Sequence, residues 1–132
     1  PNAVAIVNPN LVGDKFPSKN LAGVGVVFYV MSALKTALLN EGWFETRKIA
    51  APNLAELLDL VVLGTVADVA VLDQNNRRLV ANGIARIRAG KGNPGINALI
   101  EASVPGRKRS ARCVRCLNWV RNTISVRWPG CH

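Results

Sequence analysis

The chain has 132 residues, of which 49% are hydrophobic, and it carries a formal net charge of +9. This hydrophobic content excludes wholesale disorder, because it suffices for one domain with a modest core. The charge is unevenly distributed: residues 1–101 carry a net charge of +2, whereas residues 102–132 carry +7 and contain no acidic residue. The basic character is therefore a property of the C-terminal segment and not of the whole chain.

The first predicted element is a buried strand of a parallel sheet at residues 3–7, a short continuous apolar run that ends at Asn8 and Pro9. A loop follows and reaches Ser18. Ser18 or Asn20 can cap a helix that is expected to end at residues 40–42, where Gly42 supplies a left-handed C-terminal residue.

Residues 21–39 are apolar enough to raise the alternative of a membrane span. Lys35, two hydroxyl residues, two glycines and the lack of an aromatic belt on both sides favour a buried helix of an α/β core. Gly23 and Gly25 would let such a helix approach a sheet closely. No secretory signal pattern is present, so a cytoplasmic location and no membrane association are expected.

The second half of residues 1–101 predicts shorter helices. Asn53 is a good N-cap, with Glu56 resembling the other half of a capping box, and the helix that follows is expected to loosen at Gly64 and Thr65. Residues 73–76 have polar turn chemistry. The next helix would place Leu79, Ile84 and Ile87 inward and its arginines outward, and a short helix is expected at residues 96–102.

Two long segments resemble the RecJ-type single-stranded-DNA exonucleases of the DHH phosphoesterase family. DLVVLGTVADVAVLDQNNRRLVANGIARIRAGKGNPGINALIE, residues 59–101, resembles the fourth motif of that family and its following helices. IVNPN…FPSKNLAGVGVVFYVMSAL, residues 6–34, resembles the segment after the Asp-His-His motif. The two segments occur in the family's order and spacing.

The resemblance implies an α/β fold in which residues 1–101 are part of a DHH-type parallel-sheet domain, mostly helical in this portion. It also implies an enzyme of recombination and repair that degrades single-stranded DNA from the 5′ end with Mn²⁺ or Mg²⁺. Hard divalent cations prefer oxygen ligands, and a metal pair can activate water and stabilise charge on the phosphate. Another DHH-family phosphoesterase, such as an oligonucleotide phosphatase or a pyrophosphatase, remains an alternative.

Asp59 is the candidate metal ligand, because a carboxylate within an apolar helical run must be paired, hydrogen-bonded or metal-bound if it is buried. The alternative is that Asp59 faces solvent opposite the apolar stripe. Asp68 is a candidate for a role behind the direct ligands, or it is a helix-end residue.

Ser18, Lys19 and Asn20 precede a long helix whose N–H groups favour anions, so they are candidates for contacting a DNA phosphate; simple capping and a solvated lysine are the alternative. Arg77 and Arg78 are further candidates for contacting the DNA backbone, although paired charges on a helix are often only solvated.

The family's upstream Asp-rich and Asp-His-His motifs do not occur in the sequence. One candidate ligand cannot hold a catalytic metal centre. We therefore interpret the chain as an internal fragment that is inactive alone.

Residues 102–132 do not follow the family pattern, which should continue toward Asn-Ala-Ala-Gly-Arg. Zinc binding by the residues Cys113, Cys116, Cys131 and His132 is disfavoured, because the second pair lacks the usual spacing. A basic DNA-binding arm with Trp119 and Trp128 as stacking residues is a second possibility, and it would make the chain a non-enzymatic nucleic-acid-binding protein. The favoured interpretation is a frameshifted or disordered tail.

Overall fold

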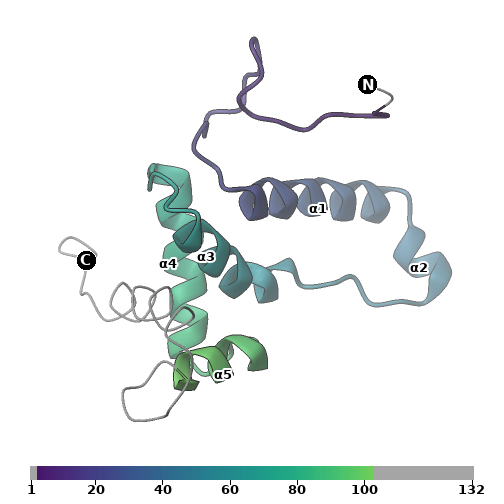
Figure 1. Cartoon of the computed structure of the whole chain (residues 1–132). Coiled ribbons are helices and arrows are strands. Elements are labelled where there is room, and N and C mark those ends of the chain that lie inside the picture. Colours follow the sequence, from purple (N-terminus) through teal and green to yellow (C-terminus); the bar gives the residue numbers. More distant parts are fainter. Residues whose placement is uncertain (1–2, 103–132) are drawn as a thin grey trace.

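The structure is a computed structural model that describes residues 3–102. Within this range the chain forms the helices α1 (Gly23–Asn40), α2 (Trp43–Arg47), η1 (a 3-10 helix, Leu54–Leu57), α3 (Leu58–Ala67), α4 (Gln74–Arg88) and α5 (Pro94–Ala102). Figure 1 shows α3 crossing α4, with α1 extending to one side and α5 near the end of α4. The expectation that this portion is mostly helical is confirmed.

The prediction of a strand at residues 3–7 is wrong for the described chain. These residues form an irregular segment, and the side chains of Val4, Ile6 and Val7 are exposed. A strand needs a neighbouring strand for its backbone N–H and C=O groups, and residues 3–102 contain none. The described residues therefore supply the helical part of the expected α/β class and not its parallel sheet.

Helix α1 begins at Gly23, after an Ala22 N-cap that has no capping side chain. Ser18 and Asn20 do not cap it. Its end is as predicted: Gly42 has a φ of 66°, and the N–H groups of Glu41 and Gly42 donate to carbonyl oxygens in the last turn of the helix.

Most of α1 is not buried. Gly25 is the buried residue of this helix, whereas Val27, Val30 and Leu34 are exposed. The prediction of a buried core helix is wrong for the described chain, because no sheet is present there to cover it. With 18 residues and a mean hydropathy of 1.4, α1 has the length and composition of a membrane span, a test that core helices of soluble proteins also pass.

The core lies between α3 and α4. Its buried residues are Val62, Val66, Val80 and Ile84. Gly83 permits the close contact, since a Cβ at this position would lie 2.3 Å from the carbonyl oxygen of Leu58.

A second close contact joins α3 to α1. A Cβ on Gly64 would lie 2.6 Å from Cγ1 of Val24. The predicted loosening at Gly64 and Thr65 is wrong, because α3 continues to Ala67 and the glycine serves helix packing instead. By contrast, nothing lies within 4 Å of a Cβ built on Gly23.

Capping side chains start η1 and α4. Asn53 caps η1 as predicted: its Oδ1 accepts the N–H of Ala55 at 3.2 Å, while its Nδ2 lies 3.4 Å from Oε1 of Glu56. Asp73 is the N-cap of α4, and its side chain accepts the N–H of Asn76. Residues 74–76, predicted as a turn, are therefore the first turn of α4.

Candidate nucleic-acid-binding and metal-binding residues

Ser18 connects the N-terminal loop to the start of α4. Its side chain is buried, and its hydroxyl donates to Oδ2 of Asp73 at 2.6 Å. The other carboxylate oxygen of Asp73 accepts the N–H of Asn76 at 2.8 Å. One carboxylate thus caps α4 and holds the loop at the same time.

Asn76 and Asn75 extend this polar cluster. Asn76 is fully buried, and its Nδ2 donates to the carbonyl oxygens of Asn20 and Val71, each at 2.8 Å. The hydroxyl of Tyr29, in α1, donates to Oδ1 of Asn75 at 2.5 Å. The loop, α1 and the first turn of α4 are therefore tied together through side chains that are far apart in sequence.

The environment of Asp73 stabilises its charged form. Burial raises the pKa of this carboxyl, but hydrogen bonds from the N–H of Asn76 and from the Ser18 side chain outweigh that effect and hold the pKa below its ordinary value. The carboxylate of Asp73 therefore places a negative charge at the N-terminus of α4, where the helix dipole favours it.

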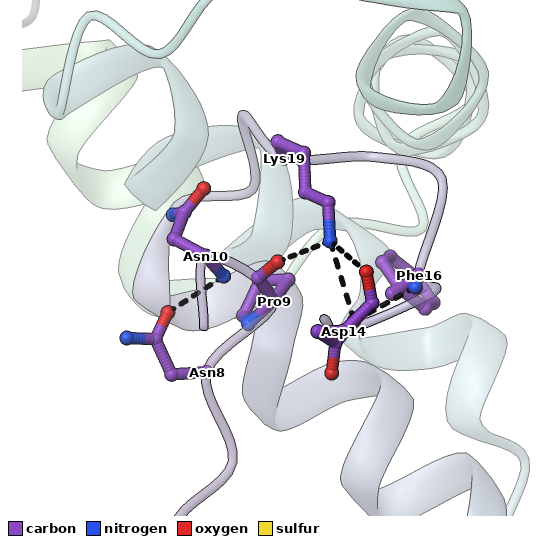
Figure 2. A network of polar contacts seen from close by, with 6 residues as sticks. All are labelled: Asn8, Pro9, Asn10, Asp14, Phe16 and Lys19. Atoms are coloured by element: carbon purple, nitrogen blue, oxygen red, sulfur yellow. Dashed lines mark hydrogen bonds and ion pairs between the residues drawn. The ribbon is translucent and has the colours of Figure 1, made fainter. Parts of the chain in front are cut away.

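Lys19 is folded onto the loop that precedes it, as Figure 2 shows. Its Nζ donates to the carbonyl oxygens of Pro9 at 2.5 Å and of Asp14 at 2.8 Å, and it lies 3.4 Å from Oδ1 of Asp14. The N–H of Phe16 and then Lys19 lower the pKa of the Asp14 carboxyl. The ammonium group of Lys19 thus stabilises this loop.

Ser18 and the carbonyl group of Asn20 are hydrogen-bonded to the first turn of α4 and its N-cap, and neither side chain caps α1. Their predicted contact with a DNA phosphate remains a prediction; in the structure the Ser18 hydroxyl donates to Asp73 and the Asn20 carbonyl oxygen accepts from Asn76. Arg77 is exposed on α4, and its Nε donates to the carbonyl oxygen of Leu72 at 2.8 Å; Arg78 is exposed on the same helix.

A cavity of about 310 Å³ lies between the N-terminal loop and α1. Phe16 and Tyr29 line it with their rings edge to face at 5.2 Å, and Asn8 and Asp14 contribute polar groups. No local sequence pattern predicts this cavity, because its walls come from two segments that meet only in the folded chain.

Asp59, the predicted metal ligand, is fully buried in the first turn of α3. Its Oδ1 accepts the N–H of Leu60 at 2.7 Å, and its Oδ2 accepts the N–H of Asn93 in a short hydrogen bond. The alternative of a solvent-facing Asp59 is therefore wrong. Asp68 is exposed and lies at the opposite end of the same helix.

These residues do not fit a divalent metal site. Mg²⁺ and Mn²⁺ require several oxygen ligands. In residues 3–102, no three His, Cys, Asp or Glu side chains come together, so the described residues do not supply enough ligands. The cysteine and histidine residues considered for zinc lie outside the described residues.

Comparison with known proteins shows that much of the chain is homologous to exonucleases specific for single-stranded DNA. The matching sequences belong to the RecJ family. The chain is 66% identical to the RecJ exonuclease of Salmonella typhimurium and 65% identical to that of Escherichia coli, in both cases over 103 residues, or 78% of this chain. It is 41% identical to Bacillus subtilis RecJ over 88 residues.

The chain spans only 18% of the length of the Salmonella and Escherichia relatives. No family model matches it, and no solved structure does. The resemblance to RecJ exonucleases found in the sequence is confirmed at this level of identity.

Proposed function

We propose that this chain supplies part of the catalytic core of a single-stranded-DNA-specific exonuclease. The observation that carries the proposal is the 63–66% identity over 103 residues to three proteins named as such exonucleases. At this identity the matched segments share their fold and packing. We further propose that the complete enzyme degrades DNA in the 5′ to 3′ direction in recombination and repair, in the cytoplasm.

The proposal includes dependence on Mn²⁺ or Mg²⁺, with Asp59 as the predicted ligand and Asp68 behind it. Since residues 3–102 contain no group of three His, Cys, Asp or Glu side chains, most ligands would come from other parts of the complete enzyme. The described helices would act as a scaffold. The packed pair of α3 and α4 holds Arg77 and Arg78 on an exposed surface, where they could neutralise DNA phosphates.

A chimera tests the proposal directly. Residues 1–101 of this chain would replace the matching segment of Escherichia coli RecJ, and exonuclease activity would be measured on 5′-labelled and 3′-labelled single-stranded DNA. We expect the chimera to retain activity within about tenfold, because substitutions between close homologues preserve packing volume and pattern. A folded chimera that digests no single-stranded DNA would refute the proposal.

The net charge of +7 in residues 102–132 favours one alternative, a non-enzymatic nucleic-acid-binding protein. In that case, DNA binding would reside in the C-terminal segment. Removing residues 104–132 would therefore distinguish the two functions.

A further inference from the structure

The turn between α4 and α5, residues 89–93, is attached to the start of α3. Asn93 donates its backbone N–H to Oδ2 of Asp59, which lies 34 positions earlier in the sequence. Asp59 is the second residue of α3 and is fully buried. A hydrogen bond to a buried carboxylate is among the stronger hydrogen bonds in proteins.

Packing of the backbone fixes the position of Asp59. At the neighbouring residue Leu58, the carbonyl oxygen is so close to Gly83 of α4 that no side chain fits between them. The carboxylate of Asp59 therefore lies near the N-terminal ends of both α3 and α5. The dipoles of these two helices favour a negative charge there.

Asn93 transmits this attachment to α5. Its Oδ1 accepts the N–H of Gly95 at 2.9 Å, and its carbonyl oxygen accepts the N–H of Asn97 at 3.0 Å, so that Asn93 acts as the N-cap of the helix. Among residues 94–101, Ile96 alone is buried. Because α5 buries so little apolar surface, its position depends strongly on this polar connection.

We infer that Asp59 acts in this chain as a structural clamp that holds α5 on the start of α3 without any metal ion. Each of its carboxylate oxygens accepts a backbone N–H. A divalent cation requires several oxygen ligands, and residues 3–102 contain no group of three His, Cys, Asp or Glu side chains that could hold one here. The clamp concerns this chain by itself, whereas the proposed ligand role of Asp59 requires further ligands from other parts of the complete enzyme; the clamp does not depend on the proposed nuclease function.

The first test compares Asp59→Asn with Asp68→Asn in the full 132-residue chain, in buffer that contains EDTA. Asp68 is a matched control, because it is an exposed aspartate at the C-cap of the same helix. Amide hydrogen exchange would be measured by NMR. For Asp59→Asn we expect exchange at Asn93 and Gly95 to be about tenfold faster or more, as loss of a hydrogen bond to a charged group implies, and no change for Asp68→Asn. Unchanged exchange in Asp59→Asn would overturn the inference.

A second test uses the unmodified chain and therefore does not depend on the folding of a variant. Paramagnetic Mn²⁺ would be titrated into the labelled protein, and the amide signals of Leu60 and Asn93 would be followed. The clamp predicts that these two signals broaden no more than those of other buried amides. Selective broadening of both signals would show that Asp59 binds the cation, and the inference would then be wrong.

Discussion

At the scale of single residues, Asp73 joins the N-terminal loop to the start of α4. It caps α4, accepts the hydroxyl of Ser18 and lies beside the buried Asn76. Removal of the Asp73 carboxylate would leave the buried Ser18 hydroxyl and the N–H of Asn76, in the first turn of α4, without an acceptor. These contacts lead to two predictions.

We expect Asp73→Ala to destabilise the chain by about 2 kcal/mol, since losing an N-cap costs about 1 kcal/mol and leaving the Ser18 hydroxyl unpaired adds a similar amount. Urea unfolding followed by circular dichroism would measure the free energy of unfolding. Ser18→Ala and the double variant complete a mutant cycle. A sum of single effects that equals the double effect would contradict coupling between the two side chains.

The lowered pKa of Asp73 predicts that stability depends on pH. The charged carboxylate is favoured in the folded chain, so its contribution is fully present above the ordinary carboxyl pKa of about 4 and is lost as the pH falls through the lowered pKa of the folded state. Unfolding measured in steps from pH 6 to pH 2 would show the decline. Asp73→Asn retains an N-cap acceptor without titrating, and it should show a smaller decline than the parent chain.

At the scale of elements, the contact between α3 and α4 depends on the absence of a side chain at one position. Gly83→Ala would place a Cβ against the backbone of Leu58, so the helices must move apart. We expect a loss of about 3 kcal/mol in the free energy of unfolding, at the upper end of the usual cost of overpacking.

Gly23→Ala is the matched control for this prediction, because nothing lies within 4 Å of a Cβ at Gly23. Alanine is the better helix former, so this variant should be neutral or slightly stabilising. Thermal unfolding of both variants would provide the comparison. Equal effects of the two substitutions would show that the close contact at Gly83 is not present in solution.

At the scale of the whole molecule, the uneven charge separates the two proposed functions. Deletion of residues 104–132 lowers the formal net charge from +9 to about +2. If the chain functions as part of an exonuclease core, its weak binding to single-stranded DNA, measured by fluorescence anisotropy at several salt concentrations, should decrease but persist. Complete loss of binding would favour the basic nucleic-acid-binding protein.

We also expect the purified 132-residue chain to show no Mn²⁺-dependent nuclease activity. The described residues provide one candidate metal ligand, and its oxygens accept backbone N–H groups. A gel assay with labelled single-stranded DNA and MnCl₂ would test this. Digestion that disappears with EDTA would show that the chain forms a complete metal site.

The sequence predicted the helical character of the described residues, the cap at Asn53 and the left-handed Gly42, because these features depend on near neighbours along the chain. The resemblance to RecJ exonucleases was also visible in the sequence, because it depends on residue identity. The strand at residues 3–7 was wrong because a strand is completed by another strand, and the loosening at Gly64 was wrong because the glycine serves a contact with α1.

For the candidate site, the sequence by itself determined which side chains could carry charge or bind DNA, since that is a property of residue type. Only the tertiary structure decided what these side chains contact: Ser18 binds Asp73, Lys19 folds onto its own loop, and Asp59 accepts the N–H of Asn93. The physical reason is that caps and turns involve residues a few positions apart, whereas burial and long-range hydrogen bonds depend on how α3, α4 and the N-terminal loop pack together.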